Sequence, residues 1–536
     1  MRKAFFKVGV VLLAVTMLSA CAGQTPSATS ISSSSSPSPA ATQADSATPT
    51  PLAGTATAQS GASSGPTSVV VRVPTDPDHL DPHLSAASLT QQMMLNVFEG
   101  LVRPTPDGGI EPAVAQSYSV SNDGLTYTFI LRRGIKFHNG DLVTVDDLRY
   151  TFERLMGKDT GKPLTSNLDA VASLETPDAS TFVVHLKKVN SSFLALLPTL
   201  SILPRSNDGH HDQHPIGTGP YKFVEYLPQQ RLVLEKFTDY WQPGVPVIDR
   251  VEFRIIPDDQ AALLALQSGQ VQLTGISADQ AASLGSKFKI VSHGANSVLL
   301  MAMNEQRKPF DDIRVRQAIE YAVDKDAIIT AVFNGYATKL GSNMSPVMAK
   351  YYADGLTNVY PVDIAKAKSL LSAAGYPNGF ETTVSVSSHA PMYAQAAQIV
   401  AQQLAQIGIR LKIETVEWGV WLDRIYTNRD YDMTIIDFTG KLDPYAVLGR
   451  YTSDYPRNFF NYKNPAYDTL MQQALGQTDE AKRVELYKQA QQILTQDAVA
   501  VYICDYQFVW AMDPKLQGYT PYPIFFHDMA RLSYAQ

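Results

Sequence analysis

The chain has 536 residues, which is more than one hydrophobic core can serve, so two or more globular parts are expected. Its net charge is −7, and its lysines and arginines are scattered, which leaves no basic patch for nucleic acid. Nucleic-acid binding is therefore excluded.

The first 20 residues have the pattern of a secretory signal peptide. Three cations among the first seven residues precede an apolar run from Val8 to Leu18. This run is short for a bilayer span, which takes about 20 residues. It ends in Leu18-Ser19-Ala20-Cys21, which resembles the bacterial lipobox. We therefore expect Cys21 to carry a lipid; the alternative is an ordinary small-residue cleavage site with a cysteine there by chance.

A polar stretch of low complexity occupies residues 21–68. Beyond Cys21 it consists almost wholly of Ser, Thr, Ala, Pro, Gly and Gln, with Asp45 as its only charge. Such a composition cannot bury enough apolar surface to offset its ordering entropy, so it predicts a disordered tether. A flexible coil of this length reaches roughly 40 Å. The signal, lipid and tether together predict a protein held at the extracytoplasmic face of a bacterial membrane through its lipid alone.

From residue 68 onward, strand and helix patterns alternate along the chain. Alternating apolar residues predict strands at 68–74, 126–132, 181–187, 250–256 and 409–413. Capping residues predict helices that start at Asp311 or Asp312 and run through Val323, from Asp363 to Gly375, from Pro391 to Ile407, and from Glu480 to Asp497. This mixture predicts an α/β fold.

Several motifs occur together in a fixed order. The first is the run 123–140, Asp-Gly-Leu-Thr-Tyr-Thr-Phe-Ile-Leu-Arg-Arg-Gly-Ile-Lys-Phe-His-Asn-Gly, followed by Asp146-Asp147. The others are Leu80-Asp81-Pro82, Asn96-Val-Phe-Glu-Gly-Leu101, Gly217-Thr-Gly-Pro-Tyr221, Asp312-Ile-Arg-Val-Arg-Gln-Ala318, Ala373-Ala-Gly-Tyr-Pro377 and Asp443-Pro444. Over residues 69–536 the chain resembles the family 5 solute-binding proteins, the oligopeptide-, dipeptide- and nickel-binding components of ABC importers.

The resemblance implies a clamp of two α/β lobes that are discontinuous in sequence. Lobe I takes residues 69–300, with an extra subdomain at about 111–214, and the chain returns to it over 501–536; lobe II takes 301–500. Crossings near 297–304 and 500–510 are the expected hinge. A ligand that touches both lobes only in the closed state favours closure. The implied partners are a peptide or other small polar solute and the permease and ATPase subunits of an importer.

This chain departs from the peptide binders at both ligand anchors that the resemblance implies. The stretch 435–444 is one residue shorter than in the peptide binders, so that Lys441 stands at the position of the carboxylate that pairs with the ligand's ammonium group. Asp437 is the neighbouring candidate for the missing carboxylate. Lys441 favours an anionic or polyhydroxy ligand, unless it pairs with Asp437 or Asp443 and meets no ligand. The Arg-x-Tyr anchor for the ligand carboxylate is replaced by Ser387-x-His389.

Aromatic residues are further candidates for ligand contact. Trp418 and Trp421 stand where the peptide binders that the chain resembles have a tryptophan lining the cleft. We expect one of the two in the core and prefer Trp418 as the ligand contact. The complete set of candidate ligand-binding residues is His389, Trp418, Trp421, Asp437, Phe438, Thr439, Gly440 and Lys441.

Other classes of function have less support. There is no His-Glu-x-x-His motif, and the Gly-x-Ser-x-Gly run at residues 61–65 lies in the low-complexity stretch and forms no strand–turn–helix elbow, so we expect no enzyme and no cofactor. His210-His211-x-x-His214 could bind zinc, but turn residues surround it, and we expect a solvated loop rather than a metal site. The alternatives that stay open are a sensory lipoprotein and a binding protein for an oligosaccharide or an anionic metabolite. A monomer is expected.

Overall fold

The computed structural model describes residues 67–85, 87–524 and 526–535. The predicted signal peptide, the predicted lipidation at Cys21 and nearly all of the predicted tether lie outside the described residues. None of the helices in the described ranges has the length and apolarity that a bilayer crossing needs. The described part is mixed α/β structure, as the sequence predicts.

One large sheet runs through both lobes. In the described ranges it holds eleven strands, in the order β15-β14-β16-β12-β17-β11-β1-β10-β9-β8, with β13 paired to β17. The strands are β1 (Ser68–Val73), β8 (Tyr221–Leu227), β9 (Arg231–Lys236), β10 (Arg250–Ile255), β11 (Leu273–Ile276), β12 (Lys289–Met303), β13 (Ala337–Lys339), β14 (Glu381–Ser387), β15 (Arg410–Val416), β16 (Met433–Thr439) and β17 (Ala500–Met512). β14 is parallel to both β15 and β16, so the carboxyl ends of these three strands meet at one edge.

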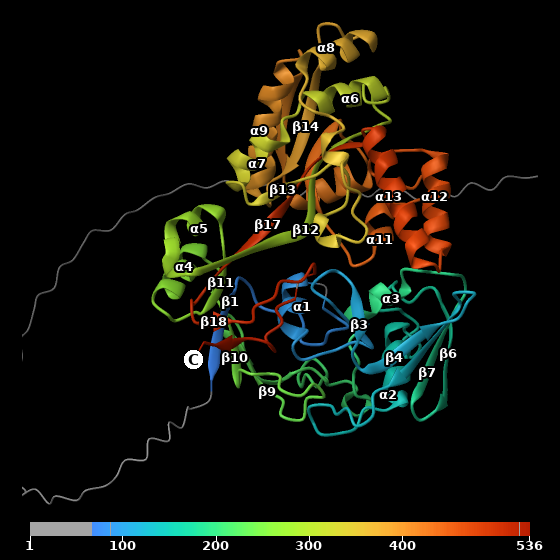
Figure 1. The fold of residues 1–536 in the computed structure, drawn as a ribbon, viewed down its shortest axis with the longest axis vertical. Coiled ribbons are helices and arrows are strands. Elements are labelled where there is room, and N and C mark those ends of the chain that lie inside the picture. The colour runs from blue at the N-terminus through green and yellow to red at the C-terminus, as the bar shows by residue number, and fades with distance from the viewer. Residues whose placement is uncertain (1–66, 86, 525, 536) are drawn as a thin grey trace, which may run out of the picture. The chain divides into compact units, whose positions relative to one another are not determined.

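Two long antiparallel strands, β12 and β17, connect the two halves of the sheet (Figure 1). The first part of β12, from Lys289 to Gly294, pairs with the part of β17 that also pairs with β11. Its last part, from Val298 to Met303, lies between β17 and β16. The register between β12 and β17 shifts between Gly294 and Val298. An irregular segment therefore separates two ladders at the junction of the lobes, and the second ladder has a further shift between Leu299 and Leu300.

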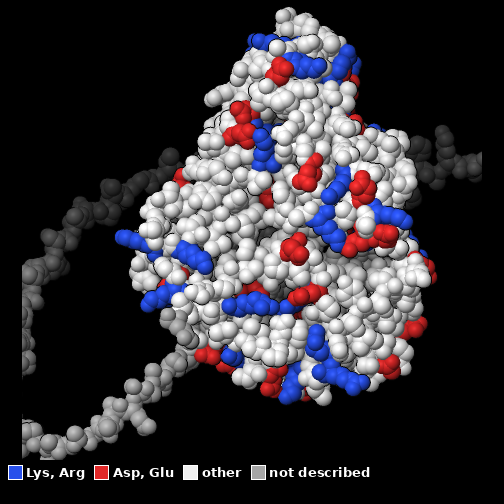
Figure 2. All heavy atoms as spheres, in the orientation of Figure 1, with Lys and Arg blue, Asp and Glu red and all other residues white. Residues whose placement is uncertain are grey.

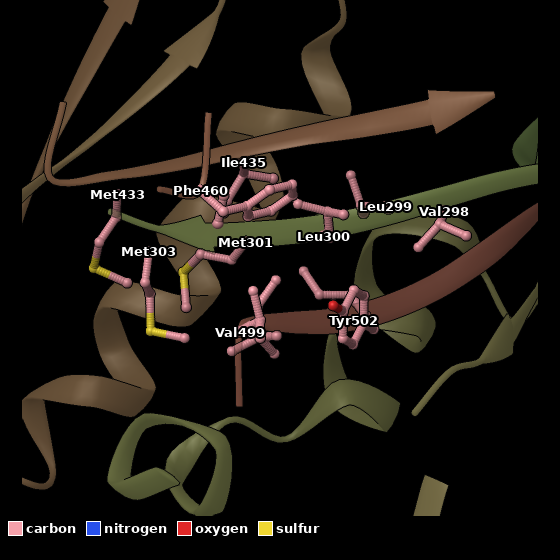
Figure 3. Packing of buried hydrophobic residues seen from close by; sticks show 14 of the residues in the cluster. Val298, Leu299, Leu300, Met301, Met303, Met433, Ile435, Phe460, Val499 and Tyr502 are labelled. Carbon is pink, nitrogen blue, oxygen red and sulfur yellow. The ribbon is translucent and has the colours of Figure 1, made fainter. Parts of the chain in front are cut away.

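Each lobe has a hydrophobic core of its own. In the second lobe, β12 is buried on both faces and reads as the continuous apolar run 298–303. Figure 3 shows this run packed against side chains of β16 and β17; the labelled residues are Val298, Leu299, Leu300, Met301, Met303, Met433, Ile435, Phe460, Val499 and Tyr502. The first lobe has one core around β1 and β10 and another in its subdomain. The lobe boundaries given above stay a prediction.

The subdomain of the first lobe is an antiparallel sheet with one main helix. The strand order is β4 (Ala115–Val120), β5 (Thr126–Leu131), β7 (Thr181–Leu186) and β6 (Val171–Asp178). The turn between β4 and β5 contains Gly124 in the left-handed region, with φ 69°. The helix α2 (Val145–Leu155) begins with a capping box between Thr144 and Asp147. Asp147 thus has a structural role within the motif that carries the family resemblance.

Helices of the second lobe follow the sequence predictions closely. Side-chain oxygens of Asp312, Asp363 and Asp479 cap three of them. The helices of this lobe are α6 (Ile313–Ala322), α7 (Lys325–Phe333), α8 (Ile364–Ala373), α9 (Pro391–Ala405), α10 (Trp418–Val420), α11 (Pro444–Leu448), α12 (Pro465–Gly476) and α13 (Glu480–Gln496). The remaining elements are α1 (Ser88–Met94), α3 (Phe193–Leu196), α4 (Asp259–Gln267), α5 (Ala278–Leu284), β2 (Val102–Pro104), β3 (Ile110–Pro112), β18 (Leu516–Gln517) and β19 (Ser533–Tyr534).

Candidate functional site

All eight candidate ligand-binding residues lie where the three parallel strands of the second lobe end. His389 follows β14, the two tryptophans follow β15, and the stretch 437–441 ends β16. Ligands of α/β proteins bind outside the carboxyl ends of parallel strands, because the connections there leave a crevice. The fold therefore gathers three separate stretches of sequence at one edge.

A carboxylate on β16, that of Asp437, is bound by three hydroxyl groups. Ser297 donates to its Oδ2 at 2.6 Å, and Tyr506 donates to the same oxygen at 3.3 Å. Tyr393 donates to Oδ1. Burial and the charge of Asp437 raise the pKa of Tyr393, so this phenol stays a proton donor. A carboxylate has about four acceptor positions. Asp437 can accept further hydrogen bonds without releasing these donors.

The irregular segment of β12 is held by a second buried carboxylate, that of Asp505 on β17. It accepts the backbone N–H of Ser297 at 3.0 Å and the hydroxyl of Ser345. Asn296, the residue before Ser297, has φ 50°, in the left-handed region. Burial raises the pKa of Asp505 to about 6, although these hydrogen bonds oppose the shift. Since Ser297 contacts both carboxylates, the candidate ligand anchor is linked directly to the junction of the lobes.

The aromatic candidates form a stack that runs from the core to the surface. Trp421 is 2% exposed and donates from Nε1 to Thr434 at 3.0 Å. Trp418 is 37% exposed and lies parallel to Trp421, with ring centroids 5.3 Å apart. The exposed ring of His389 is 4.6 Å from that of Trp418. Trp418 and His389 therefore offer an open aromatic surface, and Trp421 supports it from below.

The end of the stretch 437–441 contacts the junction of the lobes. The N–H of Gly440 donates to the carbonyl oxygen of Asn296, and Thr439 pairs with Ser297 in the ladder. A Cβ atom at Gly440 would lie 2.1 Å from Oδ1 of Asn296, so a larger residue would displace this side chain, which donates to the carbonyl oxygen of Pro523 at 3.0 Å. Phe438 lies under the guanidinium of Arg450, whose Cζ is 4.5 Å from the ring centroid.

A cavity of about 880 Å³ lies between the lobes, and it begins where the candidate residues end. Leu442 and Asp443 line it from the second lobe. Its other walls include Tyr118 and Tyr127 of the subdomain and Tyr351 of the second lobe. Among the described lining residues none of the eight candidates appears. The cavity has the volume of a ligand site, but it adjoins the predicted anchors rather than containing them.

One edge of this cavity is closed by direct contact between the lobes. Ser192 of the first lobe donates to Oδ1 of Asp443 at 2.7 Å, and the N–H of Ser191 donates to the carbonyl oxygen of Leu475 at 3.1 Å. Asp443 also caps α11 by accepting the N–H of Tyr445 at 2.7 Å. Burial raises the pKa of Asp443. The Asp-Pro motif thus takes part in a contact between the lobes.

The structure corrects one expectation about the histidine run. His211 is buried, and its Nε2 lies 3.0 Å from the hydroxyl of Tyr150, so it is a packed residue rather than part of a solvated loop. His210 and His214 are exposed, as expected. In the ranges that the structure describes, no group of three or more His, Cys, Asp or Glu residues is placed to hold a metal ion.

The surface drawn in Figure 2 carries both signs of charge in small, interspersed groups. No broad field of one sign covers this face, in keeping with the net charge of −7. Specific charges near the candidate site therefore matter more than a long-range field.

Two lobes joined by paired strands, with a ligand-sized cavity between them, define a binding protein that clamps its ligand. The family model "Bacterial extracellular solute-binding proteins, family 5 Middle" matches residues 109–459, and the chain belongs to this family. Proteins of this family are transport binding proteins and not enzymes. They act outside the cytoplasm and pass small solutes to the permease and ATPase of an ABC importer.

Three similar proteins indicate the range of ligands among its relatives. The glutathione-binding protein GsiB of Pectobacterium atrosepticum is 32% identical over 467 residues, which cover 83% of this chain and 90% of GsiB. The periplasmic binding protein DppA of Helicobacter pylori, in complex with the peptide STSA, is 28% identical with a TM-score of 0.71. AgaA from A. tumefaciens R10, in complex with agropinic acid, is 26% identical with a TM-score of 0.69. Each of these two solved structures covers 88% of this chain and is itself covered to 99%.

Sequence reasoning missed four residues of the site: Ser297, Tyr393, Tyr506 and Arg450. The first three bind Asp437, and the fourth covers Phe438. None carries a local sequence signal, because each contact depends on how separate elements pack against β16. Tyr393 alone lies near a predicted candidate, four residues after His389 on the helix α9.

Proposed function

We propose that this solute-binding protein captures a short peptide between its lobes and delivers it to an ABC importer. The observation that carries the proposal is the half-buried carboxylate of Asp437 and the open ring of Trp418 at the carboxyl ends of three parallel strands, connected through Tyr393 and His389. A carboxylate suits the ammonium group of a peptide, and a flat ring tolerates many side chains. The peptide bound by DppA and the tripeptide bound by GsiB support the same class of ligand.

Closure of the clamp follows from the link between the anchor and the junction of the lobes. Ser297 contacts both Asp437 and Asp505, so a ligand that binds Asp437 acts on the segment where β12 is irregular. A ligand that touches both lobes stabilises the closed arrangement by its differential affinity. A micromolar dissociation constant corresponds to about 8 kcal/mol, which is ample to bias such an equilibrium.

Thermal shift of the purified protein tests the class of ligand. Short peptides and glutathione should raise the melting temperature by mass action, while neutral oligosaccharides and nickel should not. Asp437→Asn should reduce the peptide-induced shift, and Asp159→Asn, which changes an exposed carboxylate of the first lobe, should leave it unchanged. A panel in which only non-peptide ligands shift the melting temperature would overturn the proposal.

A second candidate is a binding protein for an anionic metabolite. Lys441 favours it, because this cation stands where the resemblance implies a carboxylate. The agropinic acid bound by AgaA supports such a ligand. Anionic metabolites that lack a peptide bond, added to the same thermal-shift panel, separate the two candidates.

We further propose that Cys21 carries the lipid that anchors the protein. The support is the sequence Leu18-Ser19-Ala20-Cys21 after the apolar run. The wild-type protein expressed in bacteria should partition into the detergent phase of a phase-separation assay, and Cys21→Ala should move it to the aqueous phase. Equal partitioning of the two would contradict the lipid anchor.

A further inference from the structure

Two cations at the end of β16 have no acidic partner. In the part of the chain that the structure describes, Lys441 and Arg450 take part in no ion pair, and Arg450 donates no hydrogen bond. The two acids that could have paired with Lys441 have other partners and form no ion pair with it. Asp437 accepts from three hydroxyl groups, and Asp443 accepts from Ser192 and from the backbone of α11.

Arg450 is partly withdrawn from water, and its charge acts on Lys441. The Nη1 atom of Arg450 is buried without a hydrogen-bond partner, and its guanidinium lies on the face of Phe438. Desolvation, followed by the positive charge of Arg450, lowers the pKa of Lys441. Lys441 nevertheless keeps an exposed side chain. A buried donor of a charged group is costly to leave without a partner, so Arg450, with the second positive charge of Lys441 near it, calls for an anion.

Their position places this anion beside the cavity between the lobes. The residue before Lys441 is hydrogen-bonded to Asn296 at the junction of the lobes, and the residue after it lines the cavity of about 880 Å³. Lys441 therefore lies on the path between the junction and the cavity. Arg450 follows α11, the helix that begins with the wall residues Asp443 and Pro444.

We infer that Lys441 and Arg450 form an anion subsite that binds a carboxylate of the ligand and so selects acidic peptides. A guanidinium donates two parallel hydrogen bonds to a carboxylate, and an ammonium adds a point charge beside it. In the peptide binders that the chain resembles, an arginine at the position of Ser387 holds the ligand carboxylate. The cations near the end of the neighbouring strand β16 would replace that arginine. The inference rests on the proposed peptide function, and it adds the charge of the ligand.

Isothermal titration calorimetry with matched peptides tests the subsite. The probes are Glu-Ala-Ala against Gln-Ala-Ala and Ala-Ala-Glu against Ala-Ala-Gln, which differ only by a carboxylate and its amide. We expect the wild-type protein to bind the acidic member of at least one pair tenfold or more tightly. Lys441→Met and Arg450→Met should each reduce this preference severalfold and together bring it within twofold, with little change for the amide peptide.

A matched control removes one positive charge elsewhere. Lys368→Met on the exposed side of α8 should leave the preference for the acidic peptide unchanged. A wild-type protein that binds both members of each pair equally, or a preference that survives the double substitution, overturns the subsite.

If no peptide binds, the proposed peptide function is refuted, but the anion subsite is not. A second measurement then tests the subsite by itself. Succinate and citrate should then raise the melting temperature of the wild-type protein more than that of the Lys441→Met, Arg450→Met double variant. Equal shifts would overturn the subsite whatever the natural ligand is.

Discussion

The buried carboxylate of Asp505 should make the stability of the protein depend on pH. Its side chain is 1% exposed, and burial raises its pKa from 3.8 to about 6. A raised pKa means that the folded state binds the proton more tightly than the unfolded state. The carboxyl group therefore destabilises the folded state when ionised, and this cost appears as the pH rises from about 3.8 through 6.

The size of the effect follows from the shift. A shift of about two pKa units corresponds to about 3 kcal/mol in full, and about 2 kcal/mol of it falls between pH 7.5 and pH 4.5. The Asp505→Asn substitution removes the ionisable carboxyl group and keeps the shape of the side chain. Its Oδ1 can still accept the N–H of Ser297, and the hydroxyl of Ser345 can turn to accept from the new amide.

Urea unfolding of the wild type and of Asp505→Asn at several pH values measures this contribution. As the pH falls from 7.5 to 4.5, the free energy of unfolding of the wild type should gain about 2 kcal/mol relative to the variant. Asp159→Asn, which changes an exposed carboxylate, should keep a constant difference from the wild type. A wild-type-minus-variant difference for Asp505→Asn that stays within about 0.5 kcal/mol across this range would refute the reasoning.

Further predictions concern the aromatic stack and the contact between the lobes. Trp421→Ala should lower the free energy of unfolding by about 3–5 kcal/mol, because Trp421 is buried, whereas Trp418→Ala should change it by less than about 1 kcal/mol and weaken ligand binding. Urea unfolding distinguishes these outcomes, and equal losses would contradict the assignment of one ring to the core. Ser192→Ala removes the hydrogen bond to Asp443 between the lobes and should cost about 1 kcal/mol of the closed arrangement. Small-angle scattering without ligand should then show a larger radius of gyration; an unchanged radius would mean that this bond does not hold the lobes together.

Local sequence patterns predicted the strands β1, β5, β7, β10 and β15 and the helices α6, α8, α9 and α13, whereas the edge where the candidate residues gather emerged only from the fold. The helix that begins after Asp312 was predicted from a capping residue and an apolar period, and both act within about four residues. The strand β5 was predicted from its alternation and the turn before it. The candidate site was located through Asp437, Trp418 and their neighbours, all close to strand ends. Their roles in ligand binding stay predictions.

The partners of these residues were decided by the tertiary structure. Ser297 and Tyr506 reach Asp437 from strands 140 and 69 residues away, through ladders whose register shifts beside the contact. No local pattern encodes such a shift, because it results from the pairing of β12 with β17. The sequence also left open whether Lys441 pairs with an acid of its own chain. Only the fold answered this question. Among the described residues Lys441 forms no ion pair: Asp437 binds hydroxyl groups instead, and the charge that acts on Lys441 is that of another cation, Arg450.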